Sequence, residues 1–83
     1  MIHELVLTQQ DNDQWDWTLS VANPNDLNFT PTIVRTGTVT AWDKYAASDA
    51  AITAVKKLGY YHGENRHSSY NAYGTEYRSQ WDH

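Results

Sequence analysis

The chain has 83 residues, a formal net charge of −4 and no cysteine. A chain of this length forms one small domain, residues 1–83, which buries only about 60% of its unfolded surface. Without cysteine, disulfide bonds and thiolate zinc sites are excluded. No stretch reaches the ~20 apolar residues of a membrane span, and the first residues lack the pattern of a signal peptide, so we expect a soluble, cytoplasmic protein that does not bind membranes.

The acidic residues are concentrated in the N-terminal part. Residues 1–34 carry five carboxylates and no Lys or Arg, whereas residues 35–83 carry six basic and five acidic side chains. Proteins that bind nucleic acid directly usually show a basic stripe that contacts the phosphates, and this chain lacks one. Direct nucleic-acid binding is therefore disfavoured. The acidic part is either solvated or a surface for a basic partner.

The first 23 residues predict a β-hairpin with an acidic turn at residues 11–13. Its strands are residues 2–9 and 15–23, and the second strand alternates apolar and polar side chains, as a half-buried strand does. With a three-residue turn, the numbers of paired residues sum to 24, so that Leu7 faces Trp17. We therefore expect one apolar and one polar face.

A third strand is expected from Ile33 to about Tyr45, because β-branched residues are dense there. Gly37 marks a bulge, a bend or a tight reversal, and a reversal at residues 35–37 would add a short fourth strand. We favour one long strand, which gives a three-stranded antiparallel meander.

Residues 48–58 predict one helix. Ser48 is the expected N-cap, an acidic residue follows in the first turn, two lysines occupy the last turn, and Gly59 is the expected stop. Apolar side chains fall on one side of this helix at 100° per residue, so that side packs on the sheet. The predicted fold is a small α+β domain with one helix on three strands.

Residues 60–83 contain few aliphatic residues and are rich in Tyr, Ser, Asn and Gly. The tyrosines have helical spacing, but Tyr73-Gly74-Thr75 equally predicts a hairpin turn, so the local structure stays open. This composition is typical of recognition surfaces, although the rings could instead cover a small sheet. The candidate partner-binding residues are Asp11, Asp13, Asp16, Tyr60, Tyr61, Tyr70, Tyr73 and Tyr77.

Catalytic and metal-binding motifs were also sought. His62, Glu64 and His67 are the strongest metal candidates, but the spacing identifies no further ligand, and a polar loop is the commoner explanation. The sequence shows no phosphate-binding glycine loop and no nucleophile elbow. We therefore predict no metal, no cofactor and no catalytic residues, hence a non-enzymatic protein.

This plan of strands followed by a Ser-capped, alanine-rich helix from Ser48 to Gly59, in an acidic chain without cysteine, resembles small phage-encoded anti-CRISPR and anti-defence inhibitors. The resemblance implies action without catalysis in the host cytoplasm. It also implies a partner that is a host protein or a protein–nucleic acid complex, blocked sterically by the acidic hairpin and the Tyr-rich surface.

Two alternatives stay open. The first is a small nucleic-acid-binding module, in which the sheet, backed by the helix, presents aromatic rings and Arg35 to bases. The second is a protein that binds a carbohydrate or small ligand on exposed rings. The sequence also leaves open whether the chain forms a homodimer.

Overall fold

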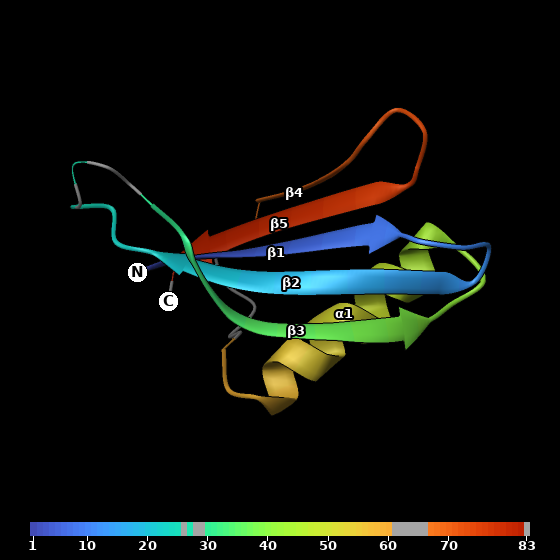
Figure 1. Ribbon diagram of the computed structural model, residues 1–83, viewed down its shortest axis with the longest axis horizontal. Coiled ribbons are helices and arrows are strands. Elements are labelled where there is room, and N and C mark those ends of the chain that lie inside the picture. The colour runs from blue at the N-terminus through green and yellow to red at the C-terminus, as the bar shows by residue number, and fades with distance from the viewer. Residues whose placement is uncertain (26, 28–29, 61–66, 83) are drawn as a thin grey trace.

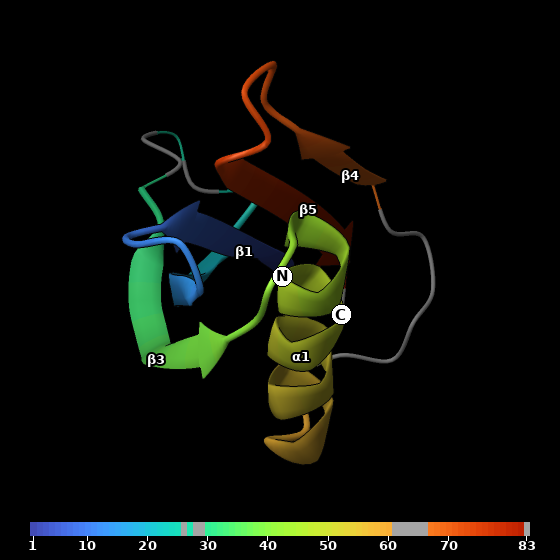
Figure 2. The same ribbon diagram turned by 90° about the vertical axis from the view of Figure 1, so that its right-hand side faces the viewer.

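The computed structural model describes residues 1–25, 27, 30–60 and 67–82. Within these ranges the elements are β1 Ile2–Gln9, β2 Gln14–Ala22, β3 Thr32–Thr40, α1 Lys44–Lys57, β4 His67–Tyr70 and β5 Glu76–Asp82. The strands form one antiparallel sheet in the order β3-β2-β1-β5-β4, and α1 packs on one face of it (Figures 1 and 2). The α+β class with one helix is confirmed. The prediction of three strands is wrong, because the C-terminal segment adds β4 and β5.

The N-terminal hairpin has the predicted register. Leu7 pairs with Trp17 and Leu5 pairs with Leu19. At the turn, the Gln10 N–H donates to the carbonyl of Gln14 over 2.8 Å, which closes the three-residue turn. Alternation of side chains thus determined both the strands and their pairing.

Strand β3 continues the meander beside β2, but it ends at Thr40 and does not reach Tyr45. Gly37 is neither a turn nor a bulge, because it lies within the ladder opposite Trp17. A Cβ on Gly37 would lie 2.6 Å from the Trp17 indole, so glycine is needed there to let the ring cross the strand. The irregularity in register lies further back, where Val34 is the extra residue of a bulge.

The C-terminal segment is a hairpin rather than a helix. Strand β5 pairs with the central strand β1, and β4 pairs only with β5. The turn between them is built around Asn71, whose side-chain oxygen accepts from the backbone N–H of Thr75 over 2.8 Å. Gly74 has φ +70°, a left-handed conformation that favours glycine. The turn prediction at Tyr73-Gly74-Thr75 is therefore the correct alternative.

Helix α1 begins four residues before the predicted start. Its N-cap is Asp43, whose carboxylate accepts from the Ala46 N–H over 2.7 Å. Ser48, the predicted cap, is a buried residue inside the helix, where its hydroxyl bonds to the carbonyl of Tyr45. The prediction failed because serine occurs both at helix caps and inside helices, where its hydroxyl bonds to a carbonyl of the preceding turn. The sequence alone does not distinguish the two positions.

We expect Asp43→Ala to lower the free energy of unfolding by about 1 kcal/mol, because the cap hydrogen bond is lost. Denaturant unfolding measures this change. Asp43→Asn keeps an acceptor at the same place and should lose much less. Equal losses for both substitutions would show that Asp43 does not act as the cap.

The end of α1 follows the prediction. Gly59 has φ +84°, its N–H donates to the carbonyl of Lys56, and the Tyr60 N–H donates to the carbonyl of Val55. This is a Schellman motif, which satisfies the last carbonyls of the helix. In the described part of the chain, no helix has the length and apolar character needed to cross a membrane.

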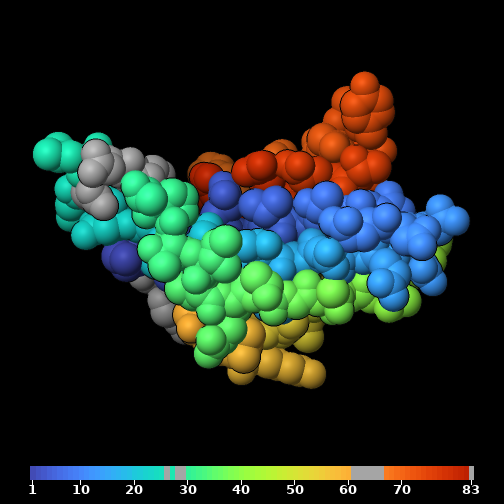
Figure 3. All heavy atoms as spheres, in the orientation of Figure 1, coloured from blue at the N-terminus to red at the C-terminus, as the bar shows by residue number. Residues whose placement is uncertain are grey.

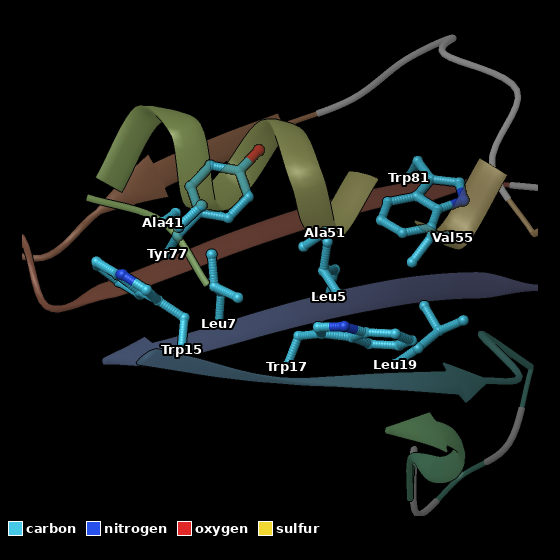
Figure 4. Close-up of a cluster of buried hydrophobic side chains, with 11 residues drawn as sticks. Leu5, Leu7, Trp15, Trp17, Leu19, Ala41, Ala51, Val55, Tyr77 and Trp81 are labelled. Carbon is cyan, nitrogen blue, oxygen red and sulfur yellow. The ribbon is translucent and has the colours of Figure 1, made fainter. Parts of the chain in front are cut away.

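The core lies between the sheet and α1 (Figure 4). The sheet contributes large side chains and the helix contributes small ones, so that the helix lies close to the rings. The core residues are Leu5, Leu7, Trp15, Trp17, Leu19, Ala41, Ala47, Ala51, Val55, Tyr77 and Trp81. The other face of the sheet has no helix over it in the described ranges and is called the open face below (Figure 2).

Candidate binding surface

Three chain connections lie together at one end of the molecule: residues 10–13, 41–43 and 71–75 (Figures 1 and 2). Backbone hydrogen bonds tie them to the sheet and to each other. The Ala41 N–H donates to the carbonyl of Asp13, and the Gln9 N–H donates to the carbonyl of Thr75, each over 2.8 Å. We call this the loop end. The backbone of the loop end is thus attached to the sheet by hydrogen bonds.

Large aromatic side chains are exposed at the loop end. Trp42 is 84% exposed and Tyr73 is 88% exposed, while the other three tryptophans are buried at 1–6%. Tyr45, in the first turn of α1, is 59% exposed. Burying a large apolar side chain usually stabilises a fold by about 1.5–3 kcal/mol. These exposed rings do not contribute that free energy to folding.

Lys44 links Tyr45 to Tyr70 and to the β4–β5 turn, which carries Tyr73. Its Nζ lies 5.2 Å from the centroid of the Tyr45 ring and 5.0 Å from that of Tyr70. The aliphatic part of its side chain packs on the β4–β5 turn, where a Cβ on Gly74 would lie 3.4 Å from the Lys44 Cδ. The first turn of α1 and the β4–β5 turn therefore form a continuous surface with one cation among aromatic rings.

Tyr70 connects this patch to the core. Its ring lies 4.9 Å from that of the buried Tyr77 and 5.5 Å from that of Tyr45. Its hydroxyl lies 2.9 Å from the Ser48 hydroxyl. Tyr70 is half-buried, so it supports the patch more than it adds contact area. We call Trp42, Lys44, Tyr45, Tyr70 and Tyr73 the aromatic patch.

The predicted acidic residues divide between two surfaces. Asp11 and Asp13 are exposed in the β1–β2 turn, which belongs to the loop end. Asp16 is exposed too, but it points from β2 to the open face, as do the residues paired with it, Thr8 and Thr38. The loop end therefore combines aromatic rings with two exposed carboxylates, and Asp16 lies outside it.

The predicted tyrosines do not form one surface. Tyr77 is 3% exposed and belongs to the core, because β5 is an inner strand of the sheet. Tyr60 is half-buried beyond the C-terminal end of α1, where its ring lies 6.0 Å from that of His3. Tyr61 lies outside the described residues, as do His62 and Glu64 of the metal candidate. Of the five tyrosines, Tyr70 and Tyr73 are placed in the patch.

The open face has a different character. No Trp, Tyr or Phe of the described strands points to it, since the rings of β2 and β5 all lie on the helix side. Arg78 donates to Glu76 over 2.6 Å and lies 3.6 Å from Glu4. The hydrogen bond to Glu76 raises the pKa of Arg78, against a smaller opposing effect of burial. The described open face thus carries the paired charges of Glu4, Glu76 and Arg78 and the exposed Asp16, and no Trp, Tyr or Phe ring.

A shallow hollow of about 270 Å³ lies on the open face, lined by Glu4, His67, Ser68, Ser69, Arg78 and Gln80. Its charged groups already bind each other, and Glu4 also accepts from Gln80 over 2.6 Å. Among the described residues no group of three or more His, Asp and Glu side chains is placed to hold a metal ion. The hollow is a weaker candidate than the loop end.

Comparisons with protein-family models, with curated proteins and with solved structures gave no match. The resemblance to anti-defence inhibitors therefore stays a prediction, and the function proposed below is inferred from the geometry of this chain.

Sequence reasoning missed three residues of the patch: Trp42, Lys44 and Tyr45. All three fall where a long third strand was expected, so the large rings were not assigned to a surface. One signal was available in the sequence, because Asp43 is a strong N-cap residue directly after Trp42. A tryptophan just before a helix cap lies in a connection, and connections lie on the surface.

Proposed function

We propose that this protein is a non-enzymatic binding protein that attaches to another protein through the loop end. The observation that carries the proposal is the exposure of Trp42 and Tyr73 in connections that are hydrogen-bonded to the sheet. Tryptophan and tyrosine are the residues that most often dominate the energy of protein interfaces. The small core buries the other three tryptophans and leaves Trp42 exposed, which favours a role for Trp42 in contact with another protein.

The charge of the loop end suggests the chemistry of the partner. Asp11 and Asp13 are exposed in the β1–β2 turn at the same end of the molecule as the patch, and Lys44 lies among the rings, so this end combines exposed carboxylates with aromatic side chains. Such a surface suits a partner with an apolar pocket bordered by Lys or Arg. The carboxylates would speed association and the rings would slow dissociation. They would also repel phosphates, so direct nucleic-acid binding is disfavoured.

We further propose that binding blocks the partner sterically, as the resemblance to phage-encoded inhibitors implies. A host defence protein, or the protein part of a host protein–nucleic acid complex, would offer the basic surface that this end requires. The nucleic-acid module is the weaker alternative, because it requires Trp and Tyr rings on the open face, and the described strands carry theirs on the helix side.

The proposal is tested by capture from host lysate with immobilised protein. We expect Asp11→Lys combined with Asp13→Lys to weaken capture about tenfold or more, chiefly at low salt, because both substitutions reverse charge at the loop end. Leu27→Ala is a matched control, since Leu27 is fully exposed in the connection between β2 and β3, away from the loop end. A partner retained equally by the charge-reversed variant would remove the carboxylates from the mechanism.

A further inference from the structure

Among the described residues, the sheet ends at β3, and the long outer edge of this strand pairs with no other strand. Strand β3 is outermost in the strand order and has nine residues, whereas the opposite edge strand, β4, has four. The side chains of β3 lie on the surface along one side of the molecule (Figure 3). Long edge strands usually carry a feature that prevents pairing with another chain, such as a lysine, a proline or a bulge. Here the bulge at Val34 lies near the start of the strand, and residues 35–40 are left as a regular stretch.

The hydrogen bonds of the sheet show which backbone groups face this edge. The Ala41 N–H donates to the carbonyl of Asp13. Bonds in an antiparallel ladder alternate, so every second residue of β3 back from Ala41 is bonded to β2. The residues between them, Thr36, Thr38 and Thr40, therefore point their N–H and C=O groups outward. All three are exposed, and their side chains lie on the open face.

This edge is complementary to itself. Consider two copies that pair antiparallel with Thr38 opposite Thr38 of the second copy. Thr36 then lies opposite Thr40 of the second copy, and Thr40 lies opposite Thr36 of the second copy. Each outward-facing residue then pairs with an outward-facing residue, which allows two backbone hydrogen bonds per pair. On the open face every threonine meets a threonine, a favourable cross-strand pair.

The charges near the edge tolerate this arrangement. The charged residue within the regular stretch is Arg35, whose guanidinium donates to the carbonyl of Val34 and lies 6.0 Å from the ring of Tyr60. Asp16 lies one strand inside the edge. The two copies of Asp16 would be three strand spacings apart, about 14 Å, which exceeds the Debye length of ~8 Å at physiological salt.

The flank of α1 beside this edge carries small apolar residues and one lysine. Tyr45 and Ser48 contact Tyr70 on the β4 side. At 100° per residue, the opposite flank presents Ala50, Ala54 and the exposed Lys57, with Leu58 nearer the buried side. Leu58 is 47% exposed, and the C-terminal end of α1 extends past β3 (Figure 1). A two-fold axis normal to the sheet keeps both helices on one face, so these flanks would face each other.

We propose that β3 is a self-association edge, and that two copies pair through it about a two-fold axis at Thr38 to form one ten-stranded antiparallel sheet. The paired edge is separate from Tyr73, which lies on the β4–β5 turn. The pairing would bring Trp42 near Val34 of the second copy, so the variants tested below keep Trp42 unchanged.

Cysteine cross-linking tests the register, because the chain has no cysteine of its own. Thr38→Cys lies on the axis, where paired Cα atoms are about 5.5 Å apart, within the range of a disulfide. Thr36→Cys is the matched control, since its two copies are offset by four residues, about 13 Å. Under mild oxidation we expect a covalent dimer for Thr38→Cys and at least tenfold less for Thr36→Cys. Equal yields, or none for Thr38→Cys, would overturn the proposal.

Charge pairs on the exposed threonines give an independent measurement by sedimentation equilibrium. Thr36→Lys with Thr40→Lys sets lysine opposite lysine, and should raise the dimer Kd at least tenfold. Thr36→Glu with Thr40→Lys sets opposite charges face to face and should preserve the dimer. A wild-type protein that stays monomeric at millimolar concentration, or a double-lysine variant that dimerises as well as wild type, would contradict pairing through β3.

Discussion

Gly37→Ala is expected to lower the free energy of unfolding by about 1–3 kcal/mol, the usual cost of overpacking. The added methyl group would lie 2.6–2.7 Å from three atoms of the Trp17 indole, which is 6% exposed and packed against the core. To relieve this contact, the ring must shift against the core or β3 must move away from β2. In a domain of this size each kcal/mol lowers Tm by about 4–8 °C, so thermal unfolding measures the loss easily.

A double-mutant cycle identifies the cause. In a Trp17→Leu background the indole is absent, so adding Gly37→Ala should cost much less than it does in the wild type. Thr36→Ala, on the exposed side of the same strand, is the control for strand propensity and should change stability by less than about 0.5 kcal/mol. If the alanine penalty is the same with and without the indole, contact with Trp17 is not its source.

Trp42→Ala and Tyr73→Ala are each expected to weaken binding of the partner about 30-fold, the effect of losing about 2 kcal/mol at an interface hot spot. Neither should alter the unfolding midpoint appreciably, because both side chains are more than four-fifths exposed. Titration of the captured partner against each variant gives the affinity, and circular dichroism gives the stability.

Tyr77→Ala is the contrasting variant. Its ring is 3% exposed, so truncation should destabilise the fold by about 3–5 kcal/mol through the cavity it leaves. Loss of binding with a retained fold for Trp42→Ala, and loss of fold for Tyr77→Ala, would separate contact from packing. Full affinity in the Trp42→Ala and Tyr73→Ala variants would mean that the aromatic patch is not the contact surface.

Sequence patterns predicted well the elements that depend on residues close together in the chain. Alternation in Trp15-Asp16-Trp17 predicted a strand, and a three-residue turn predicted its register; both depend on neighbours within the hairpin. Gly59 ended the helix as expected, since a left-handed residue at a helix end strongly favours glycine. The N-terminal limit of the helix was less determined, because Asp43 and Ser48 are both good caps in sequence.

The missing strands depend on non-local pairing. Strand β5 pairs with β1 across most of the chain, and no pattern within residues 67–82 identifies that partner. A local signal existed, since Tyr77, Ser79 and Trp81 alternate with polar residues. The buried serine weakened it, and the spacing of the tyrosines suggested a helix instead. The surface was predicted only in part for the same reason, since which rings are buried depends on the sheet that β5 completes.

A photo-cross-linking amino acid placed at position 73 would test the binding surface most directly. Position 18 on the open face is the control, because Thr18 lies in the middle of β2 on the side opposite the helix. After irradiation in host lysate we expect one covalent adduct with a host protein from position 73 and none from position 18. An adduct from position 18 alone, or none from position 73, would contradict a binding surface at the loop end.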